Sequence, residues 1–121
     1  MGVCIVDDST ISRDVVKMAM SMAKLEVSIE AVDGVDALEK ISKESNKVEL
    51  FILDINMPRM DGLTLLKEIR KIDSDTPVIM LTTETDKEKM AAAKADGATG
   101  WVIKPFDTDK LLKIVNMVLK R

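Results

Sequence analysis

Five short apolar runs alternate with five stretches of helical periodicity along the 121-residue chain. The apolar runs fall at residues 3–6, 27–32, 50–54, 78–81 and 99–103. Each run has the length of a strand, and the residues after it place apolar side chains three and four positions apart, as on one face of a helix. This alternation is typical of an α/β domain with a parallel sheet and right-handed crossovers. We therefore expect a single domain over residues 1–121, with five parallel strands and five helices.

Local signals mark several ends of these elements. Asp33-Gly34 predicts a turn after the second strand. Asp61 is placed to cap the third helix. Residues 85–88 have the form of a capping box for the fourth helix, which Gly97 closes. That helix is rich in alanine and has Met90 as its one large apolar residue, so we expect it to pack weakly on the core.

The composition narrows the classes of function. Hydrophobic residues make up 46% and charged residues 32% of the chain, the balance of a folded globular protein. The net charge is −3 and there is no basic run, which argues against a nucleic-acid partner. With no histidine in the chain, a histidine base, metal ligand or phosphate carrier is excluded.

The sequence also indicates a compartment. No stretch approaches the length of a membrane span, and Asp7 and Asp8 interrupt the N-terminal run before a signal peptide could form. The single Cys4 cannot form an internal disulfide, which fits a reducing compartment. Its apolar neighbours favour a buried structural thiol over a reactive one. We expect a cytoplasmic protein without a membrane partner.

The run at residues 50–53 leads directly into Asp54, and the chain breaks at Pro58. A wholly apolar run of this length indicates a strand buried on both faces of the sheet. Asp54 would then stand at the carboxyl end of its strand, the edge at which open α/β sheets bind ligands. Burial there favours the neutral form of a carboxyl group. Taken alone, Asp54 could equally be an N-cap or turn aspartate.

Other strands also end in polar side chains that can take part in chemistry. Asp7 and Asp8 follow the first strand, Thr82 the fourth and Lys104 the fifth. Three carboxylates at one edge repel one another unless a cation lies between them, and oxygen ligands favour Mg²⁺ first and Mn²⁺ next. A carboxylate nucleophile at Asp54, a divalent cation, an ammonium and a hydroxyl are the groups that phosphoryl transfer needs.

In order and spacing these residues resemble the motifs of response-regulator receiver domains. The resemblance extends over essentially the whole chain and also includes Asp33-Gly34 and Met57-Pro58-x-Met60-Asp61-Gly62. It implies a flavodoxin-like, doubly wound sheet with strand order 2-1-3-4-5.

The resemblance implies a role for each matching residue. Asp54 is similar to the aspartate that accepts a phosphoryl group from a histidine kinase. Asp8 resembles a direct Mg²⁺ ligand and Asp7 a ligand acting through water, while Asp54 and the backbone carbonyl of Asn56 complete the metal site. In these proteins the chemistry is limited to self-phosphorylation and autodephosphorylation, so an enzyme in the usual sense is not expected.

Further residues match the switch and the determinants of phosphoryl lifetime. Thr82, followed by Thr83, resembles the hydroxyl that moves to the phosphoryl group, and Lys104 resembles its ion partner. The Lys104-Pro105 bond is expected to be cis, a state that needs proline. Trp101 occupies a position where receivers usually carry a Tyr or Phe that turns inward on activation, so the resemblance implies a switch residue there, although the larger indole departs from the family's pattern. The alternative is a structural role for Trp101, as a half-buried ring on an edge strand.

Asn56 and Glu84 occupy the two positions that modulate hydrolysis of the acyl phosphate in this family, and the pair is similar to that of chemotaxis receivers. The resemblance thus implies a stand-alone, monomeric chemotaxis receiver that carries signal from its kinase to a flagellar motor switch protein, with an aspartyl-phosphate phosphatase as a further partner. A phosphorelay shuttle or phosphate sink is the alternative. A haloacid dehalogenase-type phosphatase is a remote one, because such enzymes place an acid/base Asp where this chain has Asn56.

Overall fold

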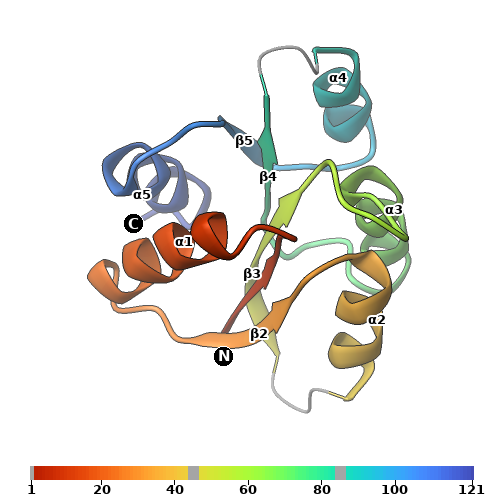
Figure 1. The fold of residues 1–121 in the computed structure, drawn as a ribbon, viewed down its shortest axis with the longest axis horizontal. Coiled ribbons are helices and arrows are strands. Elements are labelled where there is room, and N and C mark those ends of the chain that lie inside the picture. The colour runs from red at the N-terminus through yellow and green to blue at the C-terminus, as the bar shows by residue number, and fades with distance from the viewer. Residues whose placement is uncertain (1, 44–46, 84–86) are drawn as a thin grey trace.

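The computed structural model describes residues 2–43, 47–83 and 87–121, and within them five parallel strands alternate with five helices (Figure 1). The strands are β1 (Gly2–Val6), β2 (Val27–Ala31), β3 (Val48–Asp54), β4 (Val78–Thr82) and β5 (Gly100–Ile103). The helices are α1 (Thr10–Met22), α2 (Gly34–Lys43), α3 (Gly62–Ile72), α4 (Lys87–Ala95) and α5 (Thr108–Val118). The strand order is β2-β1-β3-β4-β5, which confirms the predicted topology.

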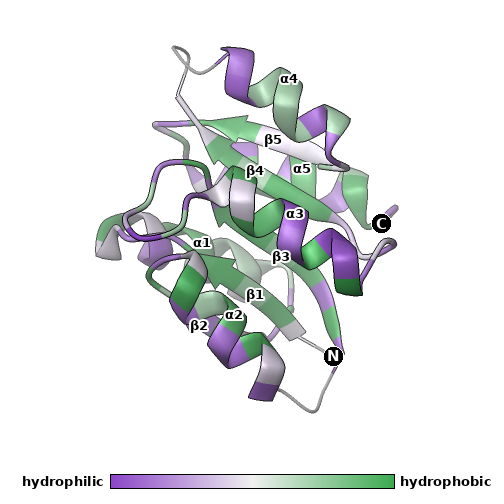
Figure 2. Ribbon diagram, turned by 90° about the vertical axis from the view of Figure 1, so that its right-hand side faces the viewer, coloured by the Kyte–Doolittle hydropathy of each residue, from purple (hydrophilic) through white to green (hydrophobic). Residues whose placement is uncertain are grey.

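The sheet separates two layers of helices. Helices α1 and α5 cover one face, and α2, α3 and α4 cover the other (Figure 1). Successive side chains of a strand point to opposite faces, so Val3 and Ile5 join the core under α1 and α5, whereas Cys4 and Val6 join the core under α2 and α3. Figure 2 shows β1 and β4 as largely apolar, whereas the helices alternate apolar and polar residues. Cys4 is fully buried, as predicted for a structural thiol.

Helix ends follow local capping chemistry. The Asp61 carboxylate accepts a hydrogen bond from the backbone N–H of Thr64 at 2.9 Å, which confirms the predicted cap of α3. Gly97 has φ +99° just beyond the end of α4, a conformation that glycine adopts without a steric penalty. The proposed capping box of α4 includes residues 85 and 86, which lie outside the described residues.

The chain bends at Asp33 after β2, as the turn signal predicts, but Gly34 already belongs to α2. The Asp33 carboxylate accepts a hydrogen bond from the N–H of Asp36 at 2.8 Å, as an N-cap does, and Gly34 is the first helical residue. A Cβ on Gly34 would lie 2.6 Å from Cγ of Met60, so the glycine allows the loop after β3 to pack against the start of α2.

Helix α4 is weakly anchored, as the sequence predicts. Ala93 is its one buried residue, and Lys94 and the other alanines of the helix are exposed. Among the described residues, side-chain contacts hold both ends of α4. Lys89 near its start bonds to Asn56, and just beyond its end Arg70 of α3 donates to the carbonyl of Gly97 while Lys67 of α3 lies 3.9 Å from Asp96.

Across residues 2–43, 47–83 and 87–121, no helix has the length and apolar character that crossing a membrane requires.

Candidate functional site

The carboxyl ends of four neighbouring strands bring the predicted site residues to one edge of the sheet. Asp54 is the last residue of β3 and Thr82 the last of β4. Asp7 and Asp8 follow β1, and Lys104 follows β5. Because β1, β3, β4 and β5 are consecutive in the sheet, these side chains converge from positions far apart in the sequence.

Three carboxylates form an acidic cluster at this edge. One oxygen each of Asp7, Asp8 and Asp54 lies within 4.8 Å of the others. Asp7 is fully buried and Asp54 is 4% exposed, whereas Asp8 faces solvent. Burial raises the pKa of Asp54 to about 7, and the negative charge of Asp7 acts in the same direction.

Lys104 bridges the two buried carboxylates. Its Nζ lies 3.1 Å from Oδ2 of Asp7 and 3.3 Å from Oδ1 of Asp54, and its side chain is 23% exposed. The other carboxylate oxygen of Asp7 accepts the backbone N–H of Ser9 at 2.9 Å. One ammonium therefore faces a cluster of three carboxylates, and the surplus of negative charge fits a divalent cation with oxygen ligands.

The segment after Asp54 folds back on the strand end. The N–H of Gly62 donates to the carbonyl of Ile55 at 2.8 Å, and a Cβ on Gly62 would lie only 2.1 Å from the carbonyl oxygen of Asp54. Arg59 ties this segment to the start of α2, because its guanidinium donates to both oxygens of Asp33 at 2.7 and 3.1 Å. These contacts fix the position of the backbone that includes Asn56.

The predicted switch residues lie beside the cluster. Thr82 is 1% exposed, and its hydroxyl donates to the carbonyl of Thr83 at 3.3 Å. The peptide bond between Lys104 and Pro105 is cis, as the resemblance implies. Glu84, the second predicted determinant of phosphoryl lifetime, lies outside the described residues.

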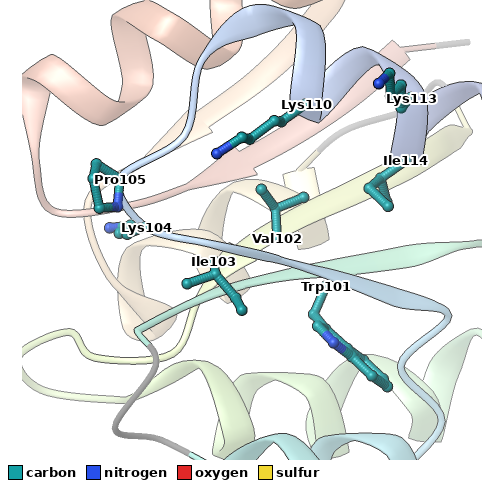
Figure 3. A pocket seen from close by; sticks show the side chains of 8 residues that line it. All are labelled: Trp101, Val102, Ile103, Lys104, Pro105, Lys110, Lys113 and Ile114. Carbon is teal, nitrogen blue, oxygen red and sulfur yellow. The ribbon is translucent and has the colours of Figure 1, made fainter.

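Trp101 lies on β5, the edge strand, and is partly buried against the core under α2, α3 and α4. It lines a hollow of about 640 Å³ between β5 and α5, shown in Figure 3. Trp101 and Ile103 lie on one side of the β5 ribbon in that view, and Lys110 and Lys113 of α5 lie on the other. The half-buried position agrees with the alternative that the sequence left open for this ring.

Two residues at the site were missed by the sequence analysis. Arg59 reaches Asp33 across 26 positions, and Lys89 reaches Asn56 across 33 positions with an Nζ to Oδ1 distance of 2.8 Å. Neither lysine nor arginine stands out in a chain with 18 basic residues, and no local spacing links the partners.

Comparisons with known proteins agree with this arrangement. A family model described as the response regulator receiver domain matches residues 3–116. The chemotaxis protein CheY of Bacillus subtilis is 36% identical over 117 residues, which cover 97% of this chain and 96% of that protein.

Solved structures show the same likeness. The chemotaxis response regulator CheY4 of Vibrio cholerae superposes with a TM-score of 0.86 at 41% identity, over 97% of both chains. A chain of the CheX–CheY–BeF₃–Mg²⁺ complex of Borrelia burgdorferi superposes with a TM-score of 0.91 at 29% identity, over 98% of this chain and 89% of that one.

Proposed function

The chain belongs to the response regulator receiver domain family, with CheY-type chemotaxis proteins among its relatives, and from this premise we propose that it is switched by phosphorylation of Asp54. The observation that carries the proposal is the buried Asp54 carboxylate, which lies within 4.8 Å of Asp7 and Asp8 and is bridged to Asp7 by Lys104.

The proposed reaction forms an acyl phosphate. A carboxylate oxygen of Asp54 attacks the phosphorus of a phosphohistidine, a P–O bond forms, and the P–N bond to the histidine breaks. The donor is a histidine kinase. Because the carboxylate must be ionised to attack, the raised pKa of Asp54 has to be lowered again by positive charge at the site.

The acidic cluster supports a metal site for this step. Asp8, Asp54, the Asn56 carbonyl and, through water, Asp7 would hold Mg²⁺, with Mn²⁺ as the second choice. Such an ion, when bound, neutralises charge on the transferring phosphoryl oxygens. Lys104 supplies a further positive charge to the same oxygens, since its Nζ already contacts Asp54.

The new charge on Asp54 would reorganise its surroundings. The Thr82 hydroxyl, now bonded to the Thr83 carbonyl, turns to donate to the phosphoryl group. The weakly anchored helix α4 and the surface around Trp101 on β5 then shift together. This shift alters the surface that a partner protein recognises. The protein performs no catalysis beyond its own phosphorylation and dephosphorylation.

The CheY-type relatives support chemotaxis as the pathway, with a chemotaxis histidine kinase as donor and a flagellar motor switch protein as reader. The Borrelia relative occurs in a complex with CheX, which supports a separate partner for the activated form, such as an aspartyl-phosphate phosphatase.

The test of phosphorylation uses acetyl phosphate with MgCl₂ and intact-protein mass spectrometry. The wild type gains one phosphoryl group, and Asp54→Asn gains none. Equal labelling of the variant would contradict the assignment of Asp54. Sustained turnover of a free phosphate ester would contradict it as well, in favour of the phosphatase class.

The test of output uses the purified protein with Mg²⁺ and beryllofluoride, titrated against a purified motor switch protein. Binding that depends on beryllofluoride and is lost in Asp54→Asn supports the chemotaxis output. Exchange of phosphoryl groups with the kinase without any such binding supports a shuttle or sink instead.

A further inference from the structure

Lys89 of α4 contacts a residue of the candidate site. Its Nζ donates to Oδ1 of Asn56 at 2.8 Å, and Asn56 lies two residues beyond Asp54. Lys89 is partly buried, unlike Lys87 and Lys94 of the same helix, which are exposed. A side chain from a separate element is therefore held at the mouth of the site by a site residue.

The charge of Lys89 is available to a ligand. Within residues 2–43, 47–83 and 87–121, no carboxylate forms an ion pair with Lys89, whose ammonium donates to the neutral amide of Asn56. Lys104 differs, because it already bridges Asp7 and Asp54. The site thus combines one cation neutralised by carboxylates with a second cation that faces a neutral partner.

An incoming phosphoryl donor is an anion that must approach three clustered carboxylates. An ammonium at the entrance offsets this repulsion, and the gain grows with the negative charge of the donor. We propose that Lys89 is a specificity-determining residue, which favours phosphoryl donors with two negative charges over donors with one. The inference rests on the proposed phosphorylation of Asp54.

Two small phosphoryl donors that differ in net charge can test this proposal. Acetyl phosphate is doubly negative at neutral pH, and attack by Asp54 breaks its P–O bond and releases acetate. Phosphoramidate carries one net negative charge, and the same attack breaks its P–N bond and releases ammonia, which keeps the protons of the leaving nitrogen. Both reactions give the same acyl phosphate on Asp54.

The size of the effect follows from Coulomb's law. A unit charge about 7 Å away in a medium as polarisable as water changes a rate by roughly threefold for each charge on the donor. Loss of the Lys89 charge should therefore lower the ratio of the acetyl phosphate rate to the phosphoramidate rate by roughly threefold. Added salt should reduce this difference, because the groups are near solvent.

The experiment measures second-order phosphorylation rate constants by mass spectrometry, with saturating Mg²⁺ and both donors. Lys89→Gln removes the charge, Lys89→Arg keeps it, and Lys94→Gln is the matched control on the same helix. We expect a ratio lowered roughly threefold in Lys89→Gln and a wild-type ratio in the other two variants.

The outcomes are distinct. Equal slowing of both donors in Lys89→Gln would show that Lys89 only holds α4 and Asn56 in place, and it would overturn the proposal. An unchanged ratio, or a matching fall in Lys94→Gln, would also overturn it. Absence of phosphorylation in the wild type with either donor would instead refute the proposed function.

Discussion

Replacing Gly62 by alanine sets two effects of opposite sign against each other at the edge of the site. Gly62 is the first residue of α3, where alanine should favour the helix by at most the roughly 0.5–1 kcal/mol that it gains over glycine in a helix interior. The added Cβ, however, would lie 2.1 Å from the carbonyl oxygen of Asp54 and 2.9 Å from Cα of Ile55. These are backbone atoms, which cannot rotate out of the way as a side chain can.

The steric effect should dominate. To restore an ordinary contact, the turn between β3 and α3 has to move by roughly 1 Å, and overpacking of a well-filled region costs about 1–3 kcal/mol. The hydrogen bond from the Gly62 N–H to the Ile55 carbonyl, 2.8 Å long, resists that movement. We expect Gly62→Ala to lower the free energy of unfolding by about 2 kcal/mol and to slow phosphorylation, since the turn also positions Asp54.

Urea unfolding monitored by circular dichroism measures the first quantity, and acetyl phosphate labelling the second. Gly100→Ala is the matched control, because its Cβ would meet only methyl carbons of Ile114 and Val118 at 3.4 Å. Its unfolding free energy should change by less than about 1 kcal/mol. If Gly62→Ala is as stable as the wild type and is labelled at the normal rate, the added Cβ does not clash with the backbone of Asp54 and Ile55, and the prediction is wrong.

Three further predictions concern titratable groups. The pKa of Asp54 is raised from 3.8 to about 7 in the folded protein, so its ionisation lowers the free energy of unfolding increasingly from about pH 4 to pH 7. Asp54→Asn removes this cost, and the variant should therefore be more stable than the wild type in EDTA at pH 8, by at most about 4 kcal/mol. No gain at pH 8, or an equal gain at pH 3.5, in urea unfolding would contradict this. Burial raises the pKa of the Cys4 thiol to about 12, so a disulfide reagent at pH 8 should label Cys4 only after the protein is denatured. Rapid labelling of the native protein would contradict the burial of Cys4. The hydrogen bonds from Arg59 hold the pKa of Asp33 below its usual value, so the stability that this pair contributes is present above about pH 4 and is lost as the pH falls through the folded pKa. The difference in unfolding free energy between wild type and Arg59→Gln should accordingly shrink with acid, and a constant difference would exclude the pair as its cause.

The strands, the helices and the acidic cluster were predictable because each depends on a local pattern. Four apolar residues before Asp54 define a buried strand, and parallel strands necessarily place Asp54, Thr82 and Lys104 at the same edge. The resemblance to receiver domains supplied the strand order, which periodicity alone does not determine.

The remaining features depend on contacts between distant segments. Asp33-Gly34 has the composition of a turn, yet it starts a helix because Met60 packs against Gly34 and Asp33 caps the first turn. Lys89 lies in an alanine-rich helix without a strong apolar face, so nothing near it in the sequence indicates its bond to Asn56. Such pairings follow from the tertiary arrangement and not from spacing.

The two faces of the sheet are completed at different times during synthesis. One core is closed by α1 and α5, near opposite ends of the described fold, whereas the other is closed by α2, α3 and α4. Val16 and Met20 of α1 can pack against Leu111 and Val115 of α5 only after α5 has been synthesised. At a translation rate of about 5–20 residues per second, this takes several seconds. During translation the apolar face of α1 is therefore the one that stays uncovered longest, because α2 and α3 on the opposite face are made well before α5.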